Sequence, residues 1–356
     1  MSFRDPNWRP VATRAVLEQR AQALACVRAF FAQRAVLEVD TPVIVNSAVT
    51  DVHIHSVEVH FPGQPRRLYL HTSPEYAMKR LLASGSGDIF QICHVARGYE
   101  RGQYHNPEFT LIEWYRLGFS LEHLMDEVEA LARAVLGPVA QPMRCERLSY
   151  VDAFQKALGI DPLTVSLQEL RWRAEEAGLP RAVARTAEGA ASTRAAAEAP
   201  DSGKASTLAA AATPDVGTRD YLLDFLMATQ IGPALGKGAL TFIHRYPASQ
   251  AALARLDSRD PRVALRFELY CEGIELANGF DELASASEQH ARFEQDLIER
   301  RRAGQTVHEI DQLLLSALEA GLPECAGVAV GFDRLLMLAT GARSIDEVLP
   351  FPTERA

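Results

Sequence analysis

Apolar residues recur along this chain with two different periods. In residues 13–34 they return every three to four positions, which predicts a long amphipathic helix. The same period predicts further helices over 72–82, 121–136, 220–231, 285–303, 308–320 and 333–341. Alternating or continuous apolar runs predict strands within 36–44, 52–60, 68–70, 89–95, 108–115, 239–243, 263–277 and 327–331. Helices and strands are mixed without strict alternation, which favours an α+β fold with a largely antiparallel sheet.

One predicted strand and one long segment depart from these patterns. The strand at 36–44 contains Pro42, which has no N–H to donate, so we expect it at a sheet edge, a bulge or an interface. Residues 182–212 are dominated by Ala with Ser, Thr, Gly and Glu, and contain no aromatic residue. Such a segment cannot build a core of its own. We therefore expect a low-complexity insertion at about residues 182–215.

Composition limits the class of protein. The 356 residues are 47% hydrophobic and 23% charged, as in ordinary globular proteins, and allow one large domain or two smaller ones. No apolar run approaches about 20 residues, so no membrane-spanning helix is expected. The first residues lack the apolar core of a signal peptide.

Cysteine and charge content restrict the compartment and the partners. The five cysteines are scattered, odd in number and without CxxC spacing, which argues against structural zinc and a disulfide framework. A reducing, cytoplasmic location fits this usage. The formal net charge of −9 argues against broad, non-specific binding of nucleic acid.

Residues 327–334 combine a strand pattern with the start of a helix. Glycine on one strand face would let a flat ligand lie against the backbone. The helix start beside it would offer N–H groups to an anion, and Arg334 would add a charge. A purine and a phosphate would suit this place, although a tight turn within the core remains an equal alternative on these residues alone.

The loop at 97–109 joins two predicted strands and is rich in charge. Arg97 leaves a buried strand, where a guanidinium is well placed to grip a phosphate. Glu100, His105 and Asn106 could hydrogen-bond a base or a ribose. The alternative is a solvated hairpin loop.

Three further acids, Glu268, Glu275 and Glu282, are candidates for binding a metal ion or an amine. A turn at Glu272-Gly273 would set Glu268 and Glu275 opposite each other across a hairpin. Two carboxylates beside a bound polyphosphate make a Mg²⁺ site. The alternative is a pair of exposed carboxylates neutralised by arginines. Glu282 is a separate acid that could receive an amine.

With these residues in place, the chain resembles the catalytic core of class II aminoacyl-tRNA synthetases. The helix and strand ending at Pro42, the loop 97–109 and the segment 327–334 are similar to their three motifs, in order. Within the class it resembles lysyl-tRNA synthetase, and more closely the elongation factor P lysine ligase family. The runs 104–110, 113–116 and 280–283 carry this closer likeness.

The resemblance implies a fold, a reaction and partners. It implies a mainly antiparallel sheet flanked by helices, forming one catalytic domain over residues 1–356 and a homodimer. Because the first motif begins near residue 13, we expect no N-terminal anticodon-binding domain, and tRNA is not an expected partner. The implied enzyme is an ATP-dependent ligase that uses Mg²⁺. It would activate (R)-β-lysine, or lysine, as an adenylate and transfer it to a lysine of elongation factor P.

The resemblance also assigns roles to individual residues. For ATP it implies Arg97 at the α-phosphate, Gly98, Tyr99, Glu100 and Asn106 in the same loop, Glu275 and Leu276 on the hairpin, and Gly331 and Arg334 at the adenine and γ-phosphate. For the amino acid it implies a pocket lined by Ser73, Pro74 and Glu75, with Glu75 at one amine, Tyr115 and Glu282 at the other, and Ala329 nearby. For Mg²⁺ it implies Glu268 and Glu275. Arg97 and Arg334 would be the catalytic residues.

Two positions depart from the pattern of the class. Tyr99 stands where the second motif usually has glutamate, and the acid is Glu100 instead. Ala329 stands where the third motif usually has its middle glycine, as in the ligase family. A methyl group there would narrow the pocket and disfavour α-lysine.

Other functions remain compatible with the sequence. The chain could charge lysine onto tRNA with a separate anticodon-binding barrel. It could be a catalytically inactive synthetase paralogue that serves as a regulatory subunit, although the motif residues are all present. An asparagine synthetase-type ligase is a remoter alternative, because an aspartate substrate would need cations where this chain has acids.

Overall fold

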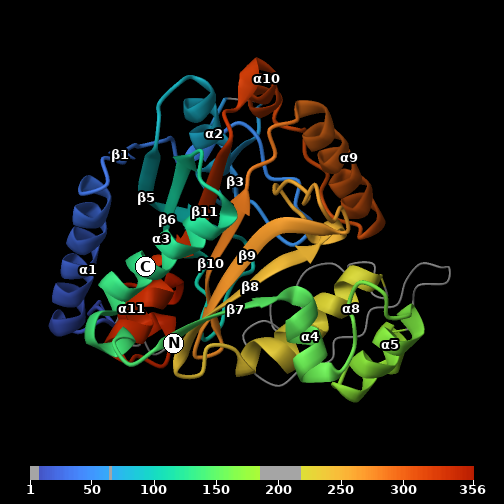
Figure 1. Ribbon diagram of the computed structural model, residues 1–356. Coiled ribbons are helices and arrows are strands. Elements are labelled where there is room, and N and C mark those ends of the chain that lie inside the picture. Colours follow the sequence, from blue (N-terminus) through green and yellow to red (C-terminus); the bar gives the residue numbers. More distant parts are fainter. Residues whose placement is uncertain (1–7, 64–65, 185–217) are drawn as a thin grey trace, which may run out of the picture.

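The computed structural model describes residues 8–63, 66–184 and 218–356 (Figure 1). Most of the Ala-rich insertion expected at about 182–215 lies outside these residues. Within them, no helix is both long and apolar enough to cross a lipid bilayer.

An eight-stranded sheet organises the fold, in the order β1-β5-β6-β11-β10-β9-β8-β7. Its strands are β1 (Leu37–Glu38), β5 (Ile89–Ala96), β6 (Glu108–Leu117), β7 (Arg144–Ser149), β8 (Ala239–Pro247), β9 (Val263–Cys271), β10 (Ile274–Asp281) and β11 (Cys325–Gly331). Only the β1–β5 and β7–β8 pairs are parallel. The predicted α+β fold with a largely antiparallel sheet is confirmed.

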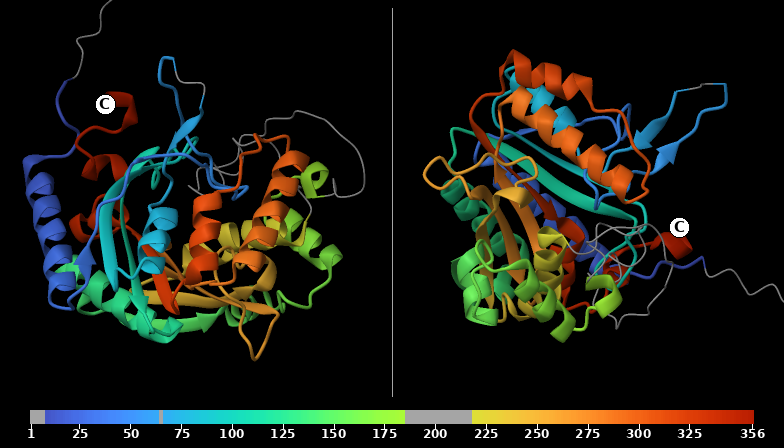
Figure 2. Two further views of the ribbon diagram at one scale, coloured as in Figure 1. Left: turned by 90° about the horizontal axis from the view of Figure 1, so that it is seen from above. Right: turned by 90° about the vertical axis from the view of Figure 1, so that its right-hand side faces the viewer.

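A second, three-stranded sheet projects from the first (Figure 2). It has the order β2-β4-β3 and consists of β2 (Ile44–Val45), β3 (Glu58–Val59) and β4 (Leu68–Leu70).

The helices form three groups around the main sheet (Figure 1). The first group covers the core face and comprises α1 (Arg14–Ala32), α3 (Leu121–Leu136) and α11 (Phe332–Thr340). The second comprises α2 (Glu75–Ala83), α9 (Ala286–Arg302) and α10 (Gln312–Gly321). The third, beside β7 and β8, comprises α4 (Tyr150–Leu158), α5 (Leu167–Glu176), α6 (Arg181–Ala184) and α8 (Arg219–Leu226). Short helical turns are η1 (Gly137–Ala140), η2 (Met227–Ile231), η3 (Gly232–Ala234), η4 (Ala248–Gln250), η5 (Ile345–Val348) and η6 (Thr353–Arg355).

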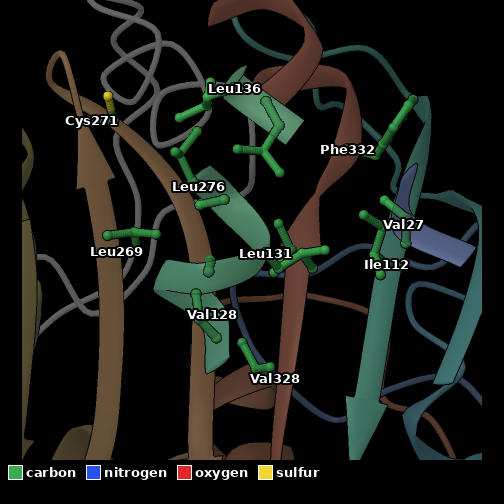
Figure 3. Close-up of a cluster of buried hydrophobic side chains, with 14 of the residues drawn as sticks. Val27, Ile112, Val128, Leu131, Leu136, Leu269, Cys271, Leu276, Val328 and Phe332 are labelled. Atoms are coloured by element: carbon green, nitrogen blue, oxygen red, sulfur yellow. The ribbon is translucent and has the colours of Figure 1, made fainter. Parts of the chain in front are cut away.

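Strand alternation places an apolar core on one face of the main sheet. Trp114, Val328, Gly279 and Phe267 stand side by side on β6, β11, β10 and β9, and the three side chains among them are buried. They pack with α1, α3 and α11 in one large cluster, part of which Figure 3 shows. Because the side-chain period of a strand is two, the neighbouring positions on the same strands face the opposite side.

A buried ion pair ties the first helix to the last. The Arg20 guanidinium lies 2.5 Å from Asp333 Oδ1 and also donates to Thr110 Oγ1. Asp333 Oδ2 accepts the Thr110 backbone N–H at 2.6 Å. α1, β6 and α11 therefore meet at one charged contact, made by Asp333 of the segment 327–334.

The structure corrects two predicted strands. The strand expected over 36–44 is two short ones, β1 and β2, because the chain leaves the main sheet between them at Pro42. β1 lies at the sheet edge, as expected. The strand expected over 52–60 contains only β3, and residues 49–54 form a loop instead.

The loop 49–54 is held by a side chain far away in the sequence. Arg300 on α9 is 1% exposed and donates to the backbone carbonyls of Thr50, Asp51 and Ile54 at 2.5–2.8 Å. An arginine that donates hydrogen bonds to several carbonyls in this way fixes the loop without any strand ladder, so hydrophobic alternation alone could not locate the loop.

Phe31 gives the first test of this packing. It is fully buried, stacks on Phe90 with ring centroids 4.3 Å apart and meets Trp114 edge-on at 5.2 Å. Phe31→Ala should lower the free energy of unfolding by about 3–5 kcal/mol, because it leaves a cavity between α1 and the sheet. Urea unfolding measures this. Phe61→Ala, at a ring that is 44% exposed, should cost less than about 0.5 kcal/mol. Equal losses in the two variants would contradict the assignment of Phe31 to the core.

Candidate active site

A cavity of about 660 Å³ lies on the face of the main sheet opposite the core. The central strands provide its floor in two rows of neighbouring residues. Glu113, Ala329 and Asn278 form one row, and Tyr115, Gly327 and Phe280 form the other. Because cross-strand partners project from the same face, these side chains share one space.

The cavity brings together most of the residues predicted from the sequence. Those that line it are Ser73, Glu75, Arg97, Glu100, Asn106, Tyr115, Glu275, Leu276, Glu282, Ala329, Gly331 and Arg334. Four predicted residues do not line it, namely Pro74, Gly98, Tyr99 and Glu268. Gly98 and Tyr99 instead contact the loop 49–55. The Gly98 N–H donates to the His55 carbonyl at 2.7 Å, and the Tyr99 ring meets the His55 ring.

A buried cluster of charge occupies one end of the cavity. Lys79 Nζ lies 2.7 Å from Glu75 Oε1 and 2.6 Å from Glu282 Oε2. The Lys79 and Glu282 side chains are each 1% exposed. Glu113 Oε2 accepts the Ser73 hydroxyl and Glu113 Oε1 accepts the Tyr115 hydroxyl, both at 2.7 Å. Three carboxylates and one ammonium group therefore share a largely buried region, in which only Glu75 keeps appreciable exposure.

Burial and mutual repulsion shift the protonation of this cluster. Burial, together with the nearby Glu75 charge, raises the pKa of Glu113 to about 7. Burial raises the pKa of Glu282 to about 8, although the Lys79 ammonium opposes this shift. Burial alone would lower the pKa of Lys79, but the charges of Glu282 and Glu75 outweigh it and raise that pKa. The carboxylates thus lack enough positive charge in the protein itself.

Gly327 makes room for this cluster. A Cβ at that position would overlap the Tyr115 ring and lie 2.5 Å from Glu282 Oε1. The glycine thus admits side chains of the protein rather than a flat ligand, which corrects part of the interpretation of 327–334. At Gly331 the nearest atoms to such a Cβ belong to Arg334, at 3.6 Å or more, so only there does the glycine leave space for a ligand.

Two arginines face the other end of the cavity. Arg97 donates from Nε to the Thr72 carbonyl, and its guanidinium lies over the Phe109 ring at 5.1 Å. Arg334 donates to the Glu275 carbonyl at 2.8 Å, and its Nη2 lies 2.7 Å from His105 Nε2. Both side chains line the same space, which is the arrangement expected for a polyphosphate.

Asn106 is engaged within the protein. Its Nδ2 donates to the Glu108 carbonyl, and its Oδ1 accepts from both the backbone N–H and the hydroxyl of Thr353. The side chain therefore anchors the C-terminal segment to the loop 97–109, and its contact with ATP stays a prediction.

The acid-bearing hairpin has a different register from the expected one. The turn at Glu272-Gly273 is confirmed, and both residues have positive φ, 52° and 78°. Glu275 is opposite Tyr270, however, and Glu268 is opposite Asn278, with a bulge between Glu275 and Ala277. The direct opposition of Glu268 and Glu275 was wrong, because the two lie diagonally on one face of the hairpin.

The two acids also differ in their surroundings. Glu268 accepts from Arg266 at 2.7 Å and from the Tyr270 hydroxyl at 2.5 Å. It is paired with an arginine, as the alternative expected, but it is buried rather than exposed. Glu275 lines the cavity beside Arg334. Within the described residues no group of three or more His, Cys, Asp or Glu is arranged to hold a metal ion. Glu275 fits a Mg²⁺ that is bound mainly by phosphates, as Mg²⁺ often is, and Glu268 would have to exchange partners to join it.

Two members of the buried cluster, Glu113 and Lys79, were not among the site residues predicted from the sequence. Glu113 interrupts an apolar run and lies two positions before Tyr115 on the same strand, so the strand period indicates that both side chains point to the same face of the sheet. Lys79 follows Glu75 by four residues, the spacing of an ion pair on a helix. The contact of Lys79 with Glu282 had no such local signal.

Comparison with known proteins assigns the family. A model of the class II tRNA synthetases (D, K and N) matches residues 3–355. The chain belongs to this family. The elongation factor P–(R)-β-lysine ligase of Vibrio cholerae serotype O1 is 45% identical over 357 residues, covering 98% of this chain and 99% of the relative. The ligase of the same name from Salmonella paratyphi B is 46% identical over 354 residues, covering 98% of each chain. The resemblance inferred from the three motifs is confirmed.

The raised pKa values of Glu113 and Glu282 predict a pH dependence of stability for this class II synthetase fold. Both values, about 7 and about 8, exceed the ordinary value of 4.5, so the folded state binds more protons than the unfolded state between these limits. The free energy of unfolding should therefore fall as the pH rises from 5 to 8.

Glu113→Gln should flatten this fall by on the order of 1–2 kcal/mol, because it removes one of the titrating groups. Urea unfolding at each pH measures the change, with the exposed Glu319→Gln as the matched control. Parallel curves for Glu113→Gln and the wild type would show that Glu113 titrates normally.

Proposed function

We propose that this protein activates (R)-β-lysine with ATP and transfers it to a lysine side chain of elongation factor P. The observation that supports this most directly is the charge of the buried cluster. Three carboxylates face one ammonium group, so the cluster would carry a net charge of −2 if Glu75, Glu113 and Glu282 were all ionised. The raised pKa values of Glu113 and Glu282 indicate that the protein alone does not support this charge. A diamino acid supplies two ammonium groups, which would balance the charge and let both carboxylates ionise as it binds. The names of the relatives supply the acceptor protein.

The other end of the cavity fits the nucleotide. Arg97 and Arg334 face one space, and the Phe109 ring lies beside Arg97 and lines the same space. We assign the α-phosphate to Arg97, and the adenine and γ-phosphate to Gly331 and Arg334. A bound Mg²⁺, held by Glu275, would neutralise the polyphosphate.

The reaction then has two steps. The amino acid carboxylate attacks the α-phosphorus, and pyrophosphate leaves with the electron pair of the broken P–O bond. Arg97 and Arg334 are placed to stabilise the charge that develops on the phosphates. The acceptor amine next attacks the acyl carbon, the bond to the phosphate oxygen breaks, and AMP leaves. Glu75, Glu113, Tyr115 and Glu282 hold the amines of the substrate during both steps.

Exposed apolar residues support the proposed homodimer. Leu37 lies within the first motif and Val43 and Ile44 follow it directly, and they are 56%, 45% and 41% exposed. Exposed large apolar side chains in and directly after the segment that the resemblance assigns to the dimer interface fit a surface that another chain covers.

A paired assay tests the proposed function. ATP–pyrophosphate exchange should occur with (R)-β-lysine and exceed that with lysine, and the intact mass of elongation factor P should rise by one β-lysyl group. Glu282→Ala should abolish exchange, since it removes a buried partner of the substrate amine. Robust charging of tRNA with lysine would instead favour the synthetase alternative. Exchange with neither isomer would favour an inactive paralogue.

Ala329 is the position to which we assign substrate preference. It lines the cavity between Glu113 and Asn278 in the floor row. Removing its methyl group should admit an α-amino group more readily. Ala329→Gly should therefore raise kcat/KM for lysine relative to (R)-β-lysine by about tenfold, the scale expected for one methyl-sized change. Ala326→Gly, a change of the same size on the core side of β11, serves as the control. An unchanged ratio in Ala329→Gly would remove this position from the specificity pocket.

A further inference from the structure

A second set of acids, on two helices that do not carry the buried cluster, lines the same cavity. Asp220 and Asp224 lie four residues apart on α8, and Asp296 and Glu299 lie three apart on α9. At these spacings each pair shares one helix face. The charge of Glu299 acts on Asp220, so the two faces are close enough to interact across the cavity.

These four carboxylates lack cationic partners in the part of the chain that the structure describes. None of them forms an ion pair there, and their partners are neutral. Asp220 accepts from Ser249, Asp224 from Gln250, Asp296 from Thr50 and Glu299 from Gln295, at 2.6–2.9 Å. Burial raises the pKa of Asp224 and of Asp296 to about 6 each. The walls thus carry negative charge that no ion pair within the described residues balances.

The nearest cations are committed elsewhere. The Arg300 guanidinium donates to the backbone carbonyls of the loop 49–54. Arg266 donates to Glu268, to Asn278 and to the Gln250 carbonyl. His53 is the other titratable group whose charge acts on both Asp220 and Asp224. Arg219, beside Asp220, donates to the carbonyls of Val165 and Pro162, and Arg292, which lines the cavity, donates to Glu288 and to the carbonyls of Ala252 and Ala254. The charges of Arg219, Arg266 and Arg300 act on the acids, but none of these arginines forms an ion pair with one of them among the described residues. A cationic ligand would complete the neutralisation of the four acids.

An independent feature of the same cavity also points to a ligand. Gln289 lies on α9 two turns before Asp296, lines the cavity and is 1% exposed. Its Oε1 is buried without a hydrogen-bond partner. A buried acceptor without a donor is destabilising unless a bound molecule supplies one.

The spacing of the acids identifies the kind of cation. No three acidic, His or Cys side chains in the described ranges converge on a metal position, so these acids do not form a site for one metal ion. Carboxylates spread over two facing helices suit a ligand with several separated positive charges, such as a protein segment that carries a lysine and other basic side chains. The hydrogen bonds from Asp224 through Gln250 to Arg266 and Asn278 lead from this wall to the floor row that contains Ala329.

We propose that the acid-lined half of the cavity, between α8 and α9, is the entry through which the acceptor protein inserts its lysine side chain. This inference rests on the proposed function and adds the surface that recognises the protein substrate. The entering ammonium group loses a proton to solvent and attacks the acyl carbon of the adenylate. The N–C bond forms, the bond to the phosphate oxygen breaks with its electron pair on AMP, and the nitrogen releases a second proton.

The test separates acceptor binding from amino acid activation. Asp220→Asn and Glu299→Gln each remove one charge, from opposite walls. We expect each to raise KM for elongation factor P by about fivefold, and Glu299→Lys to raise it further, because like charges then meet the acceptor. ATP–pyrophosphate exchange with (R)-β-lysine should keep its wild-type rate. The rise of KM with salt should be weaker in the variants. Glu176→Gln, an exposed change on the neighbouring α5, is the matched control and should leave KM unchanged.

Each other outcome is informative. An unchanged KM for elongation factor P in both wall variants, or an equal rise in Glu176→Gln, would overturn the proposed entry. Loss of exchange in the wall variants would also overturn it, because these acids would then serve the amino acid or ATP. Absence of exchange in the wild type would instead refute the proposed function, and with it the proposed entry for the acceptor lysine.

Discussion

The buried charge balance around Lys79 is the constraint on which the rest of the site depends. An isolated carboxylate in such a place would be expensive, so three of them persist only because Lys79 lies between Glu75 and Glu282 and two hydroxyls donate to Glu113. The deficit that remains is what makes a diamino acid a fitting ligand. The glycine at 327 follows from the same constraint, because any larger residue would displace Tyr115 and Glu282.

The central sheet separates this polar site from the core that supports it. Trp114 on one face packs with α1 and α3, whereas Glu113 on the other face belongs to the cavity. Adjacent residues of one strand thus serve packing and chemistry independently. The ion pair of Arg20 with Asp333 joins the two functions, because it holds α11, and with it Arg334, against β6 and α1. A rigid floor of this kind is what keeps substrate groups in a defined position.

Elements with a long and regular period were predicted closely. α1 and α3 end within about two residues of the expected limits, and β9 and β10 flank the expected turn at Glu272-Gly273. The short strands were not predicted closely. A strand of two residues, such as β1 or β2, is too short to show a hydrophobic period, and it forms only by pairing with a neighbouring strand. The loop 49–54 was not predicted for a related reason, since the side chain that holds it, Arg300, lies about 250 residues further along the chain.

By itself, the sequence determined the family, the order of the three motifs, and the gathering of Arg97, Arg334, Glu75 and Glu282 at one place. Motifs and periodicity are local, so residues can be recognised without knowing their contacts. Only the tertiary structure decided the hairpin register, which separates Glu268 from Glu275, and the contact between Lys79 and Glu282. It alone set the acids of α8 opposite those of α9. Each of these depends on packing between distant segments, and a linear pattern holds no record of which segments will meet.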